Sequence, residues 1–311
     1  YWTSPVTNSG STFTIGGVMK DGTTTTPQDI TFTSTSILDG DGTTSPITVS
    51  GRWPAKLINA LDWTRQISPS SETFNPGEGY NMKGTGGIDG SSTQNYSFVG
   101  SPNDGDYSLA IDDVRLSLIG NPYPSALDAN QFITDNTSAI AGTLYFYESG
   151  AETSHQRGDY IGGYATYNGT TGVPFGAGKT PGQYIPVGQA FFVFRDVANA
   201  GGTGTIGTDA NILFNNNQRD FVIEGATSVV FSKSATTQNN KKLTNTDPLI
   251  KIGLEFDVNE TRTFHRQLAI GFKGLTSNFE NGFDSEMFDR QPTDFALKIQ
   301  DRNTPFVITG I

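Results

Sequence analysis

The chain has 311 residues, of which 34% are hydrophobic, and its 31 acidic and 20 basic side chains give a formal net charge of −11 at pH 7. Basic residues are sparse and rarely adjacent, which argues against a nucleic acid or an anionic membrane as partner, because phosphate binding needs clustered Lys and Arg. The chain has no Cys, so disulfides, thiol catalysis and Cys-ligated zinc are excluded, and no apolar run approaches the ~18 residues of a membrane span.

Short apolar or alternating runs between Gly, Pro, Asn and Asp recur along the first two thirds of the chain. This pattern predicts β-strands joined by turns. A helical turn or two is expected only at 54–63 and after Pro124, where Ser125 with Asp128 is typical of a capping box. The predicted strands lie at 11–19, 29–38, 45–51, 96–100, 115–120, 142–148, 188–194, 211–216, 221–225 and 228–232.

The stretch "LIGNPYPSALDANQFI" at 118–133 combines a Gly, an Asn, two Pro and a Tyr. The fixed φ of Pro122 and Pro124 should stop a strand, after which Ser125 would cap a short helix. Leu127 with Phe132 and Ile133 would then be buried against the sheet. We interpret the stretch as a structural corner.

A polar segment at 233–248 divides the chain and precedes four further predicted strands, at 249–258, 264–272, 294–301 and 304–310. We therefore expect an all-β protein with a large jelly-roll-like β-sandwich and a second, smaller β-sandwich domain that is incomplete or closes against the first. The predicted boundaries are 1–235 for the large domain, 236–248 for the linker and 249–311 for the second domain. The start at Tyr1, without Met or signal peptide, indicates a piece of a larger processed protein.

Several motifs occur in a distinctive order: "YWTSPV" (1–6), "NPGEGYNMKGTG" (75–86), "FVGSPNDGDYSL" (98–109), the corner at 118–133, "GTLYFYE" (142–148), "YIPVGQAFFV" (184–193), "IKIGLEF" (250–256), "RQLAIGF" (266–272) and "NGFDSEMFD" (281–289). Together they resemble a β-rich module of large secreted and cell-surface proteins of Bacteroidetes, which precedes the C-terminal sorting domain recognised by the type IX secretion system. The resemblance implies an extracellular location. It also implies other domains of the parent protein as partners, and the secretion machinery through a downstream sorting domain. It supplies no catalytic residue.

Catalytic motifs are weak. The two histidines, His155 and His265, fall in different predicted domains, and surface or hydrogen-bonding roles are the better interpretation for both. The segment 173–182 contains Gly-Lys-Thr but lacks the first Gly of a phosphate loop, and Pro181 follows where a helix should begin. We predict no catalytic residue, although a carboxylate pair of hydrolase spacing could come from distant positions.

Calcium is the cofactor that the acidic loops suggest. Carboxylates alternate on tight Gly turns, and a third loop also carries Glu280 and Glu286. Plain Asp-Gly turns and a solvated acidic connection are the alternatives. The candidate ligands are Asp39, Asp41, Asp104, Asp106, Asp284 and Asp289.

Aromatic side chains could stack on sugar rings and make the module an adhesin that binds carbohydrate. The candidates are Trp53, Trp63, Tyr160, Tyr164 and Tyr167, and core packing is the competing interpretation. The sequence thus predicts a non-catalytic module of an exported cell-surface protein, either a structural spacer or an adhesive unit that binds a polysaccharide or another surface. The alternative is an accessory or catalytic part of an extracellular polysaccharide-degrading enzyme.

Overall fold

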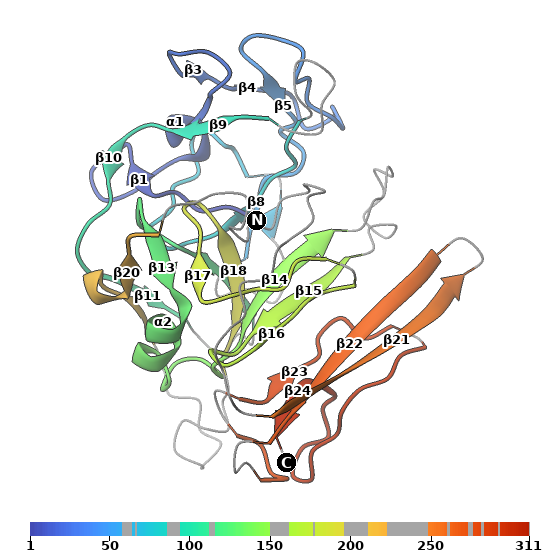
Figure 1. The fold of residues 1–311 in the computed structure, drawn as a ribbon. Coiled ribbons are helices and arrows are strands. Elements are labelled where there is room, and N and C mark those ends of the chain that lie inside the picture. Colours follow the sequence, from blue (N-terminus) through green and yellow to red (C-terminus); the bar gives the residue numbers. More distant parts are fainter. Residues whose placement is uncertain are drawn as a thin grey trace.

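The computed structural model describes residues 1–57, 64–65, 67–85, 94–111, 116–149, 162–176, 178–195, 211–222, 248–259, 262–272, 276–280, 283–291 and 293–310. Strands arranged in several small, mainly antiparallel sheets dominate this part of the chain (Figure 1). The all-β fold class predicted from the sequence is confirmed. No helix in the described ranges has the length and apolar character needed to cross a membrane.

Except for the longer β21 and β22, the strands are short, between two and six residues. They are β1 Val6–Thr7, β2 Met19–Asp21, β3 Gln28–Asp29, β4 Thr31–Phe32, β5 Thr48–Val49, β6 Ala55–Lys56, β7 Thr64–Arg65, β8 Tyr80–Asn81, β9 Tyr96–Phe98, β10 Ser101–Pro102, β11 Tyr107–Ala110, β12 Leu116–Gly120, β13 Ala126–Asp128, β14 Leu144–Ser149, β15 Gly162–Tyr167, β16 Gly172–Val173, β17 Tyr184–Ile185, β18 Ala190–Phe194, β19 Asn211–Phe214, β20 Arg219–Asp220, β21 Leu249–Asn259, β22 Arg262–Gly271, β23 Ser285–Glu286 and β24 Phe306–Gly310. The helices are α1 Ile15–Val18, α2 Ala129–Asp135 and the 3₁₀ turn η2 Asn216–Gln218.

The central sheet has five antiparallel strands in the order β12-β18-β14-β15-β16. In the β12–β18 pair Leu118 lies opposite Phe192 and Ile119 lies opposite Phe191. Because alternate side chains point to opposite faces, Ile119 and Phe191 enter one buried cluster while Leu118 and Phe192 enter another. The sheet is covered on both faces, which explains why its strands have continuous apolar sequences.

The corner at 118–133 is built as β12, a turn, β13 and the helix α2. Leu127, Phe132 and Ile133 are buried, as predicted. The predicted cap is wrong, because α2 begins one residue after Asp128, whose carboxylate accepts hydrogen bonds from the backbone N–H groups of residues 130 and 131. The Ser125 hydroxyl instead accepts from the Arg219 side chain, since β13 separates it from the helix.

The N-terminal third forms several two- and three-stranded sheets around a separate core. Phe13 stacks on Phe74 at 5.2 Å between ring centroids, and both rings pack near the buried Tyr80. The strand predicted at 11–19 is interrupted by α1, which begins where the Thr14 hydroxyl accepts from the N–H of Gly17. A local side-chain cap therefore outweighs the apolar alternation of this segment.

Two further predictions fall partly outside the described residues. The segment 54–63 is described only to residue 57 and contains the strand β6, whereas the strand predicted at 221–225 is described only to residue 222, without strand structure. The strand predicted at 228–232 lies outside the described residues, as does the predicted linker except Pro248. The domain boundaries therefore remain predictions.

The C-terminal sheet has the order β21-β22-β24-β23. Strands β21 and β22 form a long antiparallel hairpin that extends away from the central sheet (Figure 1), while β24 pairs parallel with β22. The segment predicted as a strand at 294–301 makes only an isolated bridge between Leu297 and Phe306. Val173 of β16 shares a buried cluster with Leu268 and Ile308, so the small sheet packs against the central one.

Candidate functional site

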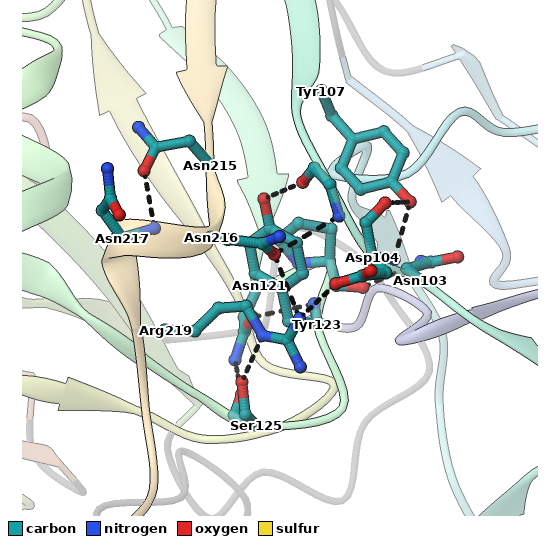
Figure 2. A network of polar contacts seen from close by, with 12 residues as sticks. Asn103, Asp104, Tyr107, Asn121, Tyr123, Ser125, Asn215, Asn216, Asn217 and Arg219 are labelled. Atoms are coloured by element: carbon teal, nitrogen blue, oxygen red, sulfur yellow. Dashed lines mark hydrogen bonds and ion pairs between the residues drawn. The ribbon is translucent and has the colours of Figure 1, made fainter.

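Polar side chains gather where the turn at 103–107, the 118–133 corner and β20 meet (Figure 2). Arg219 of β20 lies at the centre. Its Nη1 is 2.6 Å from Oδ1 of Asp104 and donates to Oδ1 of Asn216 at 3.0 Å, and its Nε donates to the Ser125 hydroxyl at 3.2 Å. One guanidinium thus connects three separate segments through its fixed fork of donors.

Tyr123 lies beneath this guanidinium, with 5.1 Å between Arg219 Cζ and the centre of the ring. Its hydroxyl donates to the carbonyl oxygen of Gly105 at 2.8 Å. Burial, followed by the phenol of Tyr107 and the carboxylate of Asp106, raises the pKa of Tyr123 far above its usual value of 10. The phenol therefore stays protonated and acts as a hydrogen-bond donor, which does not suit it to be a base or nucleophile.

The turn that carries Asp104 and Asp106 is closed by its own groups. The Tyr107 hydroxyl lies 3.1 Å from the backbone N of Asp104 and 3.0 Å from its carbonyl oxygen. Gly105 occupies a positive φ of 86° between the two carboxylates, and Asp104 forms the ion pair with Arg219 described above. The loop is therefore a glycine turn that an ion pair connects to β20, the alternative to a calcium loop that the sequence left open.

The first acidic loop is also internally bonded. Asp41 Oδ1 accepts from the backbone N–H of Thr43 at 2.8 Å and from its hydroxyl at 2.6 Å, and these bonds lower the pKa of Asp41. Asp39 instead pairs with Lys83 Nζ at 2.6 Å. Such side-chain to backbone bonds are the usual role of Asp in a turn.

The last two candidate ligands bind different partners. Asp284 is buried and accepts from the N–H groups of Glu280 at 2.7 Å and Gly310 at 2.9 Å; desolvation is the main cause that raises its pKa to about 6. Asp289 Oδ1 accepts from Arg266 at 3.0 Å and its Oδ2 accepts from the N–H of Tyr164 at 3.1 Å. Within the described ranges, no three His, Asp or Glu side chains gather as a metal-ligand set.

Of the aromatic candidates in the described residues, Trp53 and Tyr167 are buried and Tyr164 is half-buried among other rings. Trp53 is 7% exposed and its indole N–H donates to the Leu38 carbonyl at 2.7 Å, while Tyr167 is buried with its hydroxyl bonded to Asn130. The ring of Tyr164 makes edge contacts with Tyr145, Tyr147 and Phe192. Trp63 and Tyr160 lie outside the described residues. Neither Trp53 nor Tyr167 is placed to stack on a sugar.

The described histidine and the Gly-Lys-Thr loop show no catalytic or phosphate-binding arrangement. His265 lies on β22 with Nδ1 3.4 Å from Glu255 Oε1 on β21, which is the strand-surface role expected for it; His155 lies outside the described residues. In the Gly-Lys-Thr loop the N–H of Gly178 bonds the Phe175 carbonyl at 2.9 Å. No helix follows within 178–195, so the loop lacks the N-terminus that would bind a phosphate.

Sequence reasoning missed a set of buried asparagines whose side chains bond backbone groups of distant loops. The Nδ2 of Asn121 donates to the carbonyls of Ser125, Ile185 and Pro186 at 2.7–3.2 Å, and its Oδ1 accepts from the N–H of Tyr123. The others are Asn103, Asn136 and Asn168. Asn next to Gly, Pro or Thr was the available signal, but it identifies a turn and not its distant partner.

The comparisons with known proteins give a family and no further relative. A family model described as "Domain of unknown function (DUF8693)" matches residues 1–310. No curated protein and no solved structure matches the chain. Since the match extends over nearly the whole sequence, the chain belongs to the DUF8693 family.

Proposed function

We propose that the protein is a non-catalytic structural module of an exported bacterial cell-surface protein, in which it holds neighbouring domains of the parent protein apart. The motif order that resembles secreted Bacteroidetes modules supports the location. Support for the structural role comes from the described polar residues, whose ion pairs and hydrogen bonds join segments of the module to one another.

The junction between the central and C-terminal sheets is the observation that carries this proposal. The hydroxyls of Thr143 and Ser285 lie 2.8 Å apart and buried, and Asn168 Nδ2 donates to the Phe283 carbonyl at 2.7 Å. Phe288 adds ring contacts at 4.9 Å to Tyr145 and 5.1 Å to Phe194. Buried hydrogen bonds, supplemented by the ring contacts of the partly exposed Phe288, resist relative motion of the two sheets, as a spacer under load requires.

A mechanical experiment tests this role. The whole chain is stretched between its termini in optical tweezers, and we expect the two sheets to unfold in one event. The Asn168→Ala substitution leaves the Phe283 carbonyl without its amide donor and should separate the event into two. Asn217→Ala, at an exposed position, is the matched control and should behave as the original protein.

Three results would count against the proposal. Independent unfolding of the two sheets in the unmodified chain would remove the mechanical argument. Hydrolysis of any member of a polysaccharide panel, with reducing ends as the readout, would instead favour an enzyme. Retention on a glycan array without hydrolysis would favour an adhesin over a spacer.

A further inference from the structure

The outer strand of the C-terminal sheet exposes a row of large apolar side chains. Strand β21 pairs with β22 on one side and has no strand on its other side among the residues that the structure describes. Ile250, Ile252 and Leu254 are 49%, 41% and 42% exposed. Natural edge strands usually carry charges, prolines or bulges that prevent pairing with another chain.

The exposed row continues the buried face of β22. Ile252 lies opposite Leu268 and Phe256 lies opposite Phe264, and both partners on β22 are buried. Side chains two residues apart share a face, so positions 250, 252, 254 and 256 extend that apolar surface to the sheet edge. Along the same edge, the outward N–H and C=O groups of β21 have no strand partner among the residues that the structure describes.

The sequence of β21 is complementary to itself when it is read in the antiparallel direction. With Gly253 opposite Gly253 of a second copy, Lys251 of each strand faces Glu255 of the other. On the opposite face Ile252 meets Leu254, and Ile250 meets Phe256. Each opposite-charge and each apolar contact then occurs twice, as two-fold symmetry requires.

The geometry of the hairpin selects this register. The ladder with β22 is regular from Leu249 to Asp257 and shifts between Asp257 and Asn259. Gly253 is the midpoint of the regular run, so pairing about it uses the full length of the run without overlap onto the bulge. Pairing about Ile252 would leave Lys251 opposite Gly253, and pairing about Leu254 would leave Glu255 opposite Gly253.

The charged pair is accessible on the edge strand. The Glu255 side chain is 72% exposed, with His265 on β22 as its neighbour. Lys251 is exposed as a whole residue, but its ammonium is partly buried where it donates to the Gly172 carbonyl at 2.8 Å, and this desolvation lowers the pKa of Lys251. An ammonium has three donors, so Lys251 can accommodate a carboxylate from a second chain in addition.

We propose that two copies of the chain associate through antiparallel pairing of their β21 strands about Gly253. The two four-stranded sheets then become one continuous sheet, in which the apolar rows of the two copies lie side by side on the same face and contact each other across the new strand pair. Self-complementary charge favours a second copy over an unrelated partner. Association of this kind goes beyond the role of a spacer and does not depend on it.

A charge exchange tests both the dimer and its register, with mass measured by sedimentation equilibrium over a range of concentrations. We expect the unmodified chain to dimerise, and Lys251→Glu or Glu255→Lys alone to weaken the dimer about tenfold, because like charges then face each other. An equimolar mixture of the two variants should form a heterodimer, since its two cross-strand pairs are again of opposite charge. Recovery on mixing also shows that both variants are folded.

The control for the register is Asp257→Lys alone. Residue 257 faces Leu249 when the strands pair about Gly253, so this variant should dimerise as the original does, whereas pairing about Leu254 would place the new lysine against Lys251 and weaken the dimer. A dimer that Asp257→Lys weakens as much as Lys251→Glu does would overturn the proposed register. A monomeric unmodified chain at every concentration, or single variants that dimerise as well as the original, would overturn the interface itself.

Discussion

The backbone N–H of Tyr164 donates to Oδ2 of Asp289 across 3.1 Å, and this bond fastens β15 to the loop after β23. The same carboxylate accepts from Arg266, which also binds Asp294 at 2.8 Å. All three charged side chains are nearly inaccessible to water. The group is therefore a buried ionic network that connects two sheets.

Asp289→Ala should lower the free energy of unfolding by about 3–5 kcal/mol, because it leaves part of a buried guanidinium uncompensated. Urea denaturation followed by fluorescence measures the change. The matched control is Asp29→Ala, which removes an exposed pair with Lys20 and should cost less than about 1 kcal/mol. Equal losses from the two substitutions would contradict a buried network.

Asn121→Ala should destabilise the protein by about 1–3 kcal/mol, since buried backbone groups lose hydrogen-bond partners without gaining water. Asn121 is fully buried, and its amide serves three carbonyls from two segments. The same denaturation experiment applies, with Asn217→Ala as the exposed control. A change below about 0.5 kcal/mol would mean that these bonds contribute nothing net.

Asp128→Ala should cost about 1 kcal/mol through the lost cap of α2, whereas Asp128→Asn should be nearly neutral because Asn is an equally good N-cap. Far-ultraviolet circular dichroism during urea denaturation provides the measurement. Ser125→Ala acts on the bond with Arg219, so its effect should add to that of Asp128→Ala. A double variant whose loss of stability differs strongly from the sum of the two single losses would indicate that Ser125 also contributes to the helix cap.

The stability of the protein should depend on the ionisation of Asp284. Burial raises the pKa of this carboxyl from 3.8 to about 6, so between these pH values the folded state binds more protons than the unfolded state. Stability contributed by the protonated form is therefore lost as the pH rises from about 4 to about 6. Melting temperatures of the original protein and Asp284→Asn, measured across this interval, should diverge in slope. Parallel curves would contradict the shift.

The strands of the central sheet could be predicted from sequence because their apolar runs are continuous. Adjacent side chains of a strand point to opposite faces. A strand at 142–148 can therefore bury Leu144, Tyr145 and Phe146 only if both faces of its sheet are covered. At 11–19 the alternation predicted a strand, yet the Thr14 cap and the two glycines after it form a helical turn. Local hydrogen bonds of this kind are energetically close to the alternatives, so the pattern alone does not decide between them.

The polar network could not be predicted in the same way. Asp104 and Arg219 are 115 residues apart in the sequence, and no spacing rule relates two positions that meet only after folding. The sequence around Asp104 and Asp106 is compatible with a plain turn or with a cation-binding loop. Only the position of Arg219 in the folded protein shows that Asp104 forms an ion pair. Buried asparagines present the same difficulty, because the carbonyls that they bind belong to other segments.

The place of β24 within its sheet determines the order in which that sheet can assemble. Residues 306–310 are synthesised after β21, β22 and β23, but they lie between β22 and β23. The β21–β22 hairpin can form as soon as it emerges, whereas β23 has no partner until residue 310 has followed. During translation the sheet thus stays open until its inner strand arrives, and deletion of residues 306–310 would prevent its closure.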